Sequence, residues 1–371
     1  MEKSSKEKEK KDKKAYLILA DGTVYEGYSF GASGTSVGEV VFTTGMTGYQ
    51  ETLTDPSYYG QIVTQTFPLI GNYGLNDTDK ESAKVWVKGY IVREACEEPS
   101  NFRSKYTIDE YLKSQNIIGL YGIDTRALTK KIREYGVMNG AITTEMPVDL
   151  DSFISELKNY VINDAVKSVS CKKAKRYNSE DSKYHIVLYD YGYKANILRS
   201  LMDRGCDVTV VPYNTSLAEI KTLSPDGIML SNGPGDPTEN IEPIAILKEL
   251  MKLNIPVLGI CLGHQLLALA NGAKTEKLKY GHRGANQPVV DVNLDRIFVT
   301  SQNHGYAVIG DTIPEAVGFV SHFSANDKSC EGIEYSNGNA FTVQFHPEAC
   351  GGPQDTQYLF DKFIAMMSEK K

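Results

Sequence analysis

The second half of the chain alternates short apolar runs with amphipathic stretches. The apolar runs are rich in Val, Ile and Leu, which is typical of strands buried on both faces. The stretches between them repeat apolar residues every three or four positions, as helices with one buried face do. We therefore predict strands at 186–189, 207–211, 227–230 and 257–260, and helices at 195–204, 217–222 and 244–252. This alternation predicts an α/β domain with a mostly parallel sheet covered by helices, continued by a β-rich segment at 274–345 and a last helix at 358–367.

The first half has the pattern of a mixed, strand-rich α/β domain. Asp21-Gly22 separates two β-prone runs, 16–19 and 23–30, which predicts a hairpin. Further predicted strands lie at 39–44, 61–66, 85–92 and 138–144, and predicted helices at 107–114 and 125–135, the latter with Asp124 as N-cap. Residues 149–183 begin as a short helix and continue as a polar linker. The predicted parts are a tail at 1–14, an N-terminal domain at 15–148, this helix and linker, and a C-terminal domain at 184–371.

Composition and charge narrow the class of protein. A chain of 371 residues is too long for one ordinary core, so two domains are expected. The net charge is −7 and no basic patch is interleaved with aromatic residues, which argues against nucleic-acid binding. No apolar run approaches the length of a membrane span. The Lys/Glu-rich tail lacks the apolar core of a secretory signal and is expected to be disordered. Six scattered cysteines fit a reducing compartment, so we expect a cytoplasmic protein.

The segment 257–265 carries the strongest chemical signal. A predicted strand leads into Cys261, which has a glycine two residues before it and another two residues after it, and a helical pattern starts at once. This is the cysteine form of a nucleophile elbow, a strand-to-helix turn so sharp that glycine is needed on both sides. The turn places the sulfur at a helix N-terminus, where orphan N–H groups and the helix dipole favour the thiolate. Cys261 is therefore the predicted nucleophile.

A second segment supplies a base. The predicted strand at 340–345 ends in His-Pro-Glu, with His346 and Glu348. Strand side chains two positions apart project from the same face, so the Glu348 carboxylate can hold one imidazole nitrogen while the other faces the sulfur. We predict a triad of Cys261, His346 and Glu348. His264 is closer to Cys261 in sequence, but the direction of the elbow helix carries its ring away from the sulfur, and we predict a structural role for it.

The loop 231–237, Ser-Asn-Gly-Pro-Gly-Asp-Pro, directly follows another predicted buried strand. Acyl transfer needs N–H groups aimed at the oxygen on which negative charge develops. We predict two such donors, the backbone amide of Leu262, directly after the nucleophile, and that of Gly233 in this loop. The elbow, the loop and His346 all follow strands, and the carboxyl ends of parallel strands are where sites form in open α/β sheets.

Other chemistries have little support in the sequence. The six histidines are dispersed, and neither a His-Glu-x-x-His helix nor paired Cys-x-x-Cys is present, so no metal site is predicted. The glycine-rich stretches lack the ending of a phosphate loop and the fingerprint of a dinucleotide site. No nucleotide site is therefore predicted on this chain.

Taken together, these motifs resemble a known family. The elbow, the loop at 231–237, Gln-Asn-His-Gly at 302–305 and the His-Pro-Glu segment are similar to those of the class I (triad) glutamine amidotransferases. The N-terminal half is similar to the small-subunit family of carbamoyl phosphate synthetases. The segments that carry this second resemblance are Thr-Gly-Met-Thr-Gly-Tyr-Gln-Glu at 44–51, Leu-Thr-Asp-Pro-Ser-Tyr at 53–58, Gly-Asn-Tyr-Gly at 71–74 and Gly-Ile-Asp-Thr-Arg at 122–126.

The resemblance implies a set of residues that hold L-glutamine through backbone groups and a few side chains. They are Gly45, Gly233, Gly235, Leu262, Gln265, Asn303, Gly305 and Tyr306. Two positions depart from the family pattern. Gly45 stands where some relatives have a serine, so only its backbone could serve, and Tyr306 stands where phenylalanine is frequent.

The resemblance also implies a reaction and a partner. The Cys261 thiolate would attack the side-chain amide of glutamine, and His346 would protonate the leaving ammonia and then activate water to hydrolyse the γ-glutamyl thioester. A large ATP-grasp subunit, carrying ATP and magnesium, would combine the ammonia with bicarbonate into carbamoyl phosphate for arginine and pyrimidine biosynthesis. The expected assembly is a heterodimer or a higher oligomer of heterodimers, with no cofactor on this chain.

Three alternatives remain at this point. The chain could be the glutaminase component for anthranilate, aminodeoxychorismate or guanylate synthesis, although those proteins lack the domain at 16–144. It could be a non-catalytic scaffold, which an intact cysteine, histidine and glutamate set argues against. A cysteine peptidase or γ-glutamyl hydrolase would act without any partner.

Overall fold

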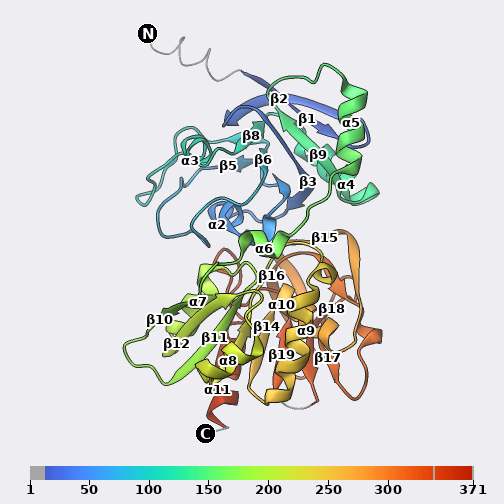
Figure 1. The fold of residues 1–371 in the computed structure, drawn as a ribbon. Helices are drawn as coiled ribbons and strands as arrows, with labels where there is room; N and C mark the ends of the chain where they lie inside the picture. The colour runs from blue at the N-terminus through green and yellow to red at the C-terminus, as the bar shows by residue number, and fades with distance from the viewer. Residues whose placement is uncertain (1–12, 337–338, 370–371) are drawn as a thin grey trace. The chain divides into compact units, whose positions relative to one another are not determined.

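The computed structural model describes residues 13–336 and 339–369. The described residues up to Asn163 form one compact unit, and those from Asp164 onward form a second (Figure 1). The Lys/Glu-rich tail predicted at 1–14 lies outside the described residues as far as residue 12. Lys14 is already the first residue of a strand.

The first unit is built around a closed barrel. Its strands follow the order β1-β2-β8-β6-β4-β3-β9, and β9 pairs with β1 to close it. The parallel pairs are β3–β4, β4–β6 and β6–β8, and the others are antiparallel. The bounds are β1 (Lys14–Leu19), β2 (Val24–Gly31), β3 (Thr35–Thr43), β4 (Gln61–Gln65), β6 (Gly89–Val92), β8 (Ile118–Tyr121) and β9 (Met138–Thr143). The predicted hairpin is confirmed, as is the strand-rich class of this domain.

The helices of the first unit begin at polar caps. In α3 (Ile108–Ser114), Thr107 and Glu110 form a capping box, and in α4 (Thr125–Tyr135) Asp124 accepts a hydrogen bond from the N–H of Ala127 at 2.9 Å. Both helices were predicted, and so was α5 (Leu150–Asn159). The elements that were not predicted are α2 (Tyr49–Thr54), the turn η1 (Pro56–Tyr58), and the short pair β5 (Leu69–Ile70) and β7 (Glu94–Ala95). The strand predicted at 85–92 was too long, because pairing begins only at Gly89.

The second unit contains one mixed sheet. Its order is β10-β12-β11-β13-β14-β19-β18-β16-β15-β17, in which the run from β12 to β19 is parallel and the strands on either side of it are antiparallel. The parallel strands are β12 (Cys206–Pro212), β11 (Tyr184–Asp190), β13 (Gly227–Leu230), β14 (Val257–Ile260) and β19 (Ala340–Val343). The antiparallel strands are β10 (Lys175–Tyr177), β15 (Thr275–Asp291), β16 (Arg296–Val308), β17 (Gly318–Ser324) and β18 (Cys330–Tyr335).

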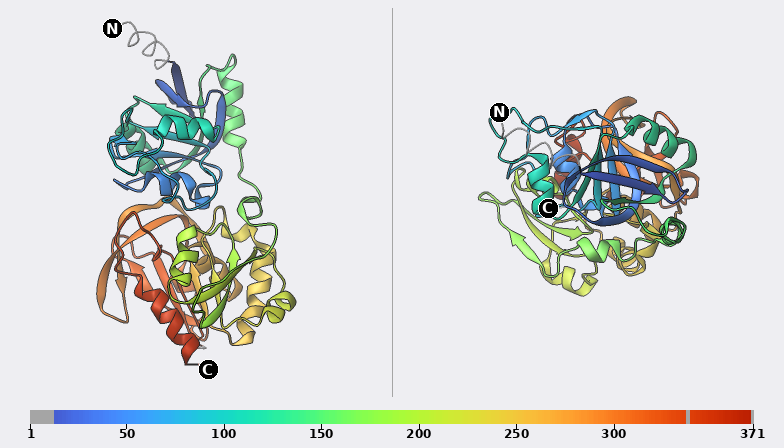
Figure 2. Two further views of the ribbon diagram at one scale, coloured as in Figure 1. Left: turned by 90° about the vertical axis from the view of Figure 1, so that its left-hand side faces the viewer. Right: turned by 90° about the horizontal axis from the view of Figure 1, so that it is seen from above.

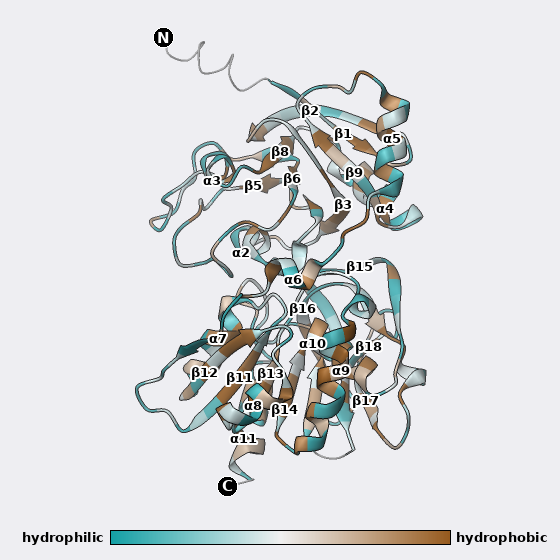
Figure 3. Cartoon of the chain, in the orientation of Figure 1, coloured by the Kyte–Doolittle hydropathy of each residue, from teal (hydrophilic) through white to brown (hydrophobic). Residues whose placement is uncertain are grey.

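Helices cover both faces of this sheet, as predicted (Figure 2). One apolar core joins the sheet to α8 (Leu217–Leu223), α9 (Ile241–Leu250) and α10 (Leu262–Ala270). The other joins it to α7 (Ala195–Met202) and α11 (Tyr358–Ser368). The central strands are hydrophobic along their length in Figure 3, because both of their faces are buried. Single turns η2 (Pro237–Glu239), η3 (Met251–Leu253) and η4 (Gly310–Thr312) complete the unit.

The linker predicted in the second half of 149–183 was wrong. That stretch contains α6 (Ala165–Val169) and β10, which pairs with β12 at the edge of the sheet. The structure divides the chain at Asn163, so the linker residues that follow belong to the second unit. The polar composition that suggested a linker is that of an edge strand, whose exposed side is polar.

Two further observations concern the whole described chain. None of its helices is long and apolar enough to cross a membrane. No disulfide joins any of the six cysteines, all of which lie within the described ranges.

Candidate active site

The predicted elbow is present at Cys261. The residue lies between β14 and α10 with φ +53° and ψ −105°, a conformation that non-glycine residues rarely adopt and that is held here by the surrounding structure. A Cβ on Gly259 would lie 3.0 Å from the carbonyl carbon of Gly263 and 2.8 Å from Cγ2 of Thr342. A Cβ on Gly263 would lie 2.4 Å from the carbonyl oxygen of Leu230. The two flanking glycines are therefore required by close backbone packing, as predicted.

Cys261 and His346 follow adjacent parallel strands, β14 and β19. The N–H of Cys261 donates to the carbonyl oxygen of Val343 at 2.9 Å. Strand β16 borders the same place, because Sγ of Cys261 lies 3.7 Å from the carbonyl oxygen of Asn303 and the N–H of His346 donates to the carbonyl oxygen of Ser301 at 2.9 Å. Cys261 and His346 thus lie at the carboxyl ends of two neighbouring strands, beside one stretch of β16.

The imidazole of His346 is held by Glu348. Nδ1 lies 2.7 Å from Oε1 of the carboxylate, and both side chains are buried. A carboxylate only accepts hydrogen bonds, so Nδ1 carries the proton and Nε2 keeps its lone pair. Nε2 is buried and has no hydrogen-bond partner among the described residues. His346 therefore has the tautomer and the unbonded lone pair that a general base needs.

Lys194 completes this arrangement, and sequence reasoning did not find it. Its Nζ lies 3.2 Å from Oε1 of Glu348, and its side chain is only 10% exposed. Burial alone would raise the pKa of Glu348, but its interactions with His346 and Lys194 outweigh burial and lower that pKa to about 2. Glu348 is thus a carboxylate at neutral pH. The one signal in the sequence is that Lys194 follows β11, so that it lies at the same carboxyl edge as Cys261 and His346.

The loop at 231–237 packs against the start of α10. The carbonyl oxygen of Ser231 accepts from the N–H of Gly263 at 3.0 Å, and Oδ1 of Asn232 accepts from the N–H of Lys194 at 3.2 Å. A Cβ on Gly233 would lie 2.7 Å from Cδ2 of Leu262, so the two predicted oxyanion donors come from adjoining segments. Leu262 is the first residue of α10, where an N–H has no intrahelical acceptor.

The predicted glutamine-binding residues of the second unit surround this edge of the sheet. Nε2 of Gln265 donates to the carbonyl oxygen of Tyr306 at 2.8 Å and to Oε1 of Gln344 at 3.0 Å. Asn303 contacts the sulfur through its carbonyl oxygen. Gly305 follows on the same strand, and Gly235 has φ +90° in the loop beside α10.

Gly45 belongs to the first unit, in the segment between β3 and α2. A Cβ there would lie 3.3 Å from the carbonyl oxygen of Thr47 and 3.9 Å from Oγ1 of Thr43, so the backbone is not closely enclosed. Its contact with glutamine stays a prediction.

His264 has the environment of a structural residue. His264 is fully buried, its Nδ1 lies 2.8 Å from Oγ1 of Thr342, and burial lowers its pKa to about 3. This agrees with the structural role predicted for it.

Among the described residues, one group of potential metal ligands is brought together, namely His282, His304 and Glu331.

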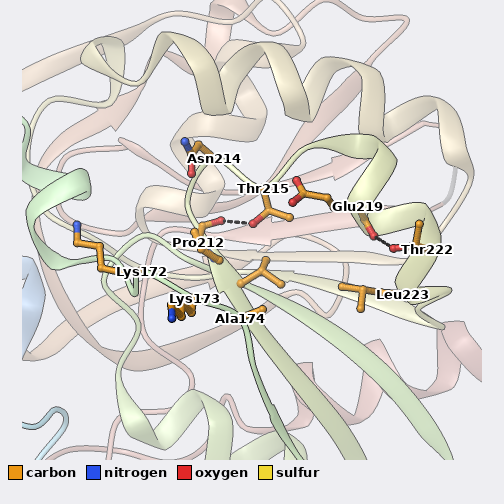
Figure 4. Close-up of a pocket in the computed structure, with 10 residues that line it drawn as sticks. Lys172, Lys173, Ala174, Pro212, Asn214, Thr215, Glu219, Thr222 and Leu223 are labelled. Carbon is orange, nitrogen blue, oxygen red and sulfur yellow. Dashed lines mark hydrogen bonds between the residues drawn. The ribbon is translucent and has the colours of Figure 1, made fainter.

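A surface pocket of about 560 Å³ opens beyond the carboxyl end of β12 (Figure 4). Lys172 and Lys173 lie on one side of it, and Thr215, Glu219 and Thr222 on another. None of the predicted catalytic or glutamine-binding residues lines this pocket. It is therefore distinct from the site around Cys261.

Family comparisons match both halves of the chain. A family model described as "Carbamoyl-phosphate synthase small chain, CPSase domain" matches residues 17–142, and one described as "Glutamine amidotransferase class-I" matches residues 187–366. The first range lies within the first unit and the second range lies within the second unit.

Curated relatives align over nearly the whole chain. A carbamoyl phosphate synthase small chain of Fusobacterium nucleatum is 53% identical over 349 residues, 94% of this chain and 96% of the relative. One of Bacillus anthracis is 53% identical over 358 residues, 96% and 97% of the two chains, and one of Staphylococcus haemolyticus is 50% identical over 357 residues, 96% of each. Among solved structures, a glutamine amidotransferase of Thermotoga maritima is 18% identical, with a TM-score of 0.37 over 50% of this chain and 85% of that one.

Proposed function

The chain belongs to the family of carbamoyl phosphate synthase small chains, and from this we propose that it is the subunit that hydrolyses L-glutamine and supplies ammonia for carbamoyl phosphate synthesis. The match of an amidotransferase family to the second unit supports the glutaminase activity. The match of the first unit to the small-chain family favours this function over the anthranilate and guanylate alternatives, which lack that domain.

One observation carries the proposed chemistry. A buried imidazole, fixed by a carboxylate at Nδ1 and unpartnered at Nε2, lies at the same sheet edge as a cysteine on a strained elbow. A nucleophile, a base and a group that orients the base are the parts needed for covalent acyl transfer. We assign these roles to Cys261, His346 and Glu348.

The reaction then follows in two steps. The sulfur of Cys261 forms a bond to the side-chain carbonyl carbon of glutamine, and the negative charge on the oxygen is received by the amides of Leu262 and Gly233. His346, which has taken the thiol proton of Cys261 at Nε2, gives that proton to the nitrogen, so that the C–N bond breaks and ammonia leaves. His346 next removes a proton from water, which attacks the γ-glutamyl thioester, so that the C–S bond breaks and glutamate is released.

Lys194 and the remaining contacts support these steps. Lys194 keeps Glu348 ionised, and an ionised Glu348 stabilises the imidazolium that forms on His346. Gln265 holds the carbonyl of Tyr306, which orders the stretch of β16 beside the sulfur. We assign glutamine contacts to Gly235, Asn303, Gly305 and Tyr306, and to Gly45 through its backbone.

The kind of partner can be inferred from ammonia, the product of the proposed reaction. Ammonia is useful only when a second active site consumes it, and we propose a large ATP-dependent subunit that binds ATP and magnesium, with no cofactor for the reaction on this chain. The absence of disulfides among the six cysteines supports assembly in the cytoplasm.

The test separates glutamine use from ammonia use. The chain is co-purified with its large ATP-dependent subunit, and carbamoyl phosphate formation is measured with each nitrogen source. Cys261→Ser is expected to abolish synthesis from glutamine and to leave synthesis from ammonia unchanged. If both activities fell together, the assigned division of labour would be wrong. A scaffold subunit would form no covalent adduct with a diazo-ketone analogue of glutamine, and a peptidase would cleave peptides in the absence of the partner.

A further inference from the structure

Three buried side chains from three strands converge on one point, away from Cys261. His282 of β15 is paired directly opposite His304 of β16, and Glu331 is the second residue of β18. Nδ1 of His282 lies 3.3 Å from Oε1 of Glu331, and Nε2 of His304 lies 3.9 Å from the same oxygen. The two rings are nearly perpendicular, with centroids 5.0 Å apart. All three ligand atoms lie within 4.8 Å of one another.

The outer nitrogen of each ring is already engaged by an acceptor. Nε2 of His282 lies 2.8 Å from Oδ2 of Asp327, and Nδ1 of His304 lies 2.8 Å from the carbonyl oxygen of Tyr306. Because carboxylates and carbonyls only accept, both outer nitrogens carry hydrogens. In neutral rings, both inner nitrogens then present lone pairs toward the Glu331 carboxylate.

A fourth acceptor faces the same point. The amide nitrogen of Gln302 donates to Oε2 of Glu331 at 3.0 Å and to Oγ1 of Thr300 at 3.2 Å. These two bonds fix the orientation of the amide and direct its oxygen to His304, with Oε1 3.1 Å from Nε2. Two imidazole lone pairs, a carboxylate oxygen and an amide oxygen thus face one another. Such an arrangement is unfavourable unless a positive charge lies among the four atoms.

Protons or a metal ion could supply that charge. Protons would require at least two inside the buried cluster, one between His282 and Glu331 and one between His304 and Gln302. A single divalent cation satisfies all four acceptors at once, and its charge balances the carboxylates of Glu331 and Asp327. Imidazole together with carboxylate is a ligand set that suits zinc, and hydrogen-bonding of the outer histidine nitrogen to a carboxylate or carbonyl is typical of histidine metal ligands.

We propose that His282, His304 and Glu331 form a zinc-class metal site, with Oε1 of Gln302 as the fourth ligand. In a tetrahedral zinc site, ligand atoms are about 3.3 Å apart, so the observed 3.3 Å fits and the 3.9 Å contact has to shorten by roughly half an ångström. Asp327 is 46% exposed and leads from the buried site to solvent, which gives an ion a way in. The role we assign to the ion is structural, since its ligands are separate from the triad of Cys261, His346 and Glu348.

The site would order the strand that borders the nucleophile. The carbonyl oxygen of Tyr306 accepts from His304 and also from Gln265 on the elbow helix, both at 2.8 Å. Asn303, whose own carbonyl oxygen contacts Cys261, directly precedes His304 on the same strand. This consequence, unlike the metal binding itself, rests on the proposed glutaminase function.

Metal binding is tested on the full-length chain with the ions alone. Because a thiolate competes for soft metals, the experiments use the Cys261→Ser background. The protein is stripped with a chelator, titrated with Zn²⁺ and with Co²⁺, and its metal content is measured after gel filtration. The variants are His282→Gln and Glu331→Gln, and the matched control is His185→Gln, whose ring bonds to Leu223 and Thr209 outside the cluster.

We expect one metal ion per chain in the background and in the control, visible-region Co²⁺ bands without a thiolate charge-transfer band, and a Zn²⁺-dependent rise in melting temperature. His282→Gln and Glu331→Gln should lose all three signals. Asp327→Asn, at the exposed rim and so the safest variant for folding, should weaken binding by about 10–100-fold. No stoichiometric binding, or binding that all three cluster variants leave unchanged, would overturn the proposal and leave a network held by protons. Either result is independent of whether the chain hydrolyses glutamine.

Discussion

Replacing Lys194 by methionine tests how the catalytic base is held. A unit charge 3.2 Å from the Glu348 carboxylate is worth about 5 kcal/mol at an effective dielectric constant of about 20. Divided by 1.36 kcal/mol per pKa unit, this is roughly 3 to 4 units. In Lys194→Met the pKa of Glu348 should therefore rise above its ordinary value of 4.5, because burial raises it and only His346 then opposes burial.

This pKa shift reverses the way in which the contribution of Glu348 to the free energy of unfolding depends on pH. In the parent protein the pKa of folded Glu348 lies below its ordinary value of 4.5, so the carboxylate adds stability above pH 4.5 that is lost as the pH falls toward about 2. In the variant the folded pKa lies above 4.5. The contribution of Glu348 is then fully present below pH 4.5 and is lost as the pH rises through that raised pKa.

The assay is urea unfolding at about pH 4 and about pH 7, combined with glutamine hydrolysis. Lys194→Met should cost about 3–5 kcal/mol at neutral pH and distinctly less in acid, because it leaves a buried charge unpaired. The double variant with Glu348→Gln should recover much of that loss, and Lys173→Met, a change at an exposed lysine, should have no effect beyond about 0.5 kcal/mol. The kcat for glutamine should fall by about 100-fold. Equal losses at both pH values, or strict additivity in the cycle, would refute the reasoning.

Three other changes follow from the site. Gly259→Ala should destabilise the second unit by about 1–3 kcal/mol in urea unfolding, because its Cβ would lie 2.8 Å from Thr342 and 3.0 Å from the backbone of Gly263; a neutral effect would mean that the elbow relaxes freely. Glu348→Gln should lower kcat for glutamine by at least about 100-fold and leave ammonia-dependent synthesis intact in the complex, and an unchanged kcat would remove Glu348 from the triad. His264→Gln should cost about 1–3 kcal/mol through its bond to Thr342 and still permit labelling of Cys261 by a diazo-ketone glutamine analogue; loss of labelling in a folded variant would reopen His264 as a base.

The sequence was most informative where structure is set by neighbours in the chain. The elbow at Cys261 depends on two glycines and on the adjoining strand and helix, all within a few residues, and it is present as predicted. The bond between His346 and Glu348 likewise joins residues two positions apart. The alternation of strands and helices in the second unit also follows from local apolar periodicity.

Features that depend on distant pairing were not predictable in the same way. Closure of the barrel requires β9 to pair with β1, and nothing in either strand alone specifies that partner. The edge strand β10 is short and polar, so it lacks the alternation that marks a half-buried strand. Lys194 meets Glu348 only because β11 and β19 end at the same edge of one sheet. The histidine and glutamate cluster is assembled from three strands, so no ligand spacing in the sequence could indicate it.

Strand β16 connects two groups of buried polar residues, the catalytic residues with Lys194 and the cluster of His282, His304 and Glu331. Its hydrogen bonds predict that changes in the two groups have different kinetic effects. Lys194 and Glu348 act on the imidazole, so losing either should lower kcat while the binding of glutamine changes little. The His282, His304 and Glu331 cluster acts on the carbonyl of Tyr306, which is shared with Gln265 on the elbow helix. If that carbonyl becomes more mobile, the predicted glutamine contacts at Asn303, Gly305 and Tyr306 are disturbed. The imidazole that transfers the proton is not affected. Glu331→Gln should therefore raise KM for glutamine more than it lowers kcat, which is the opposite of the pattern expected for Lys194→Met.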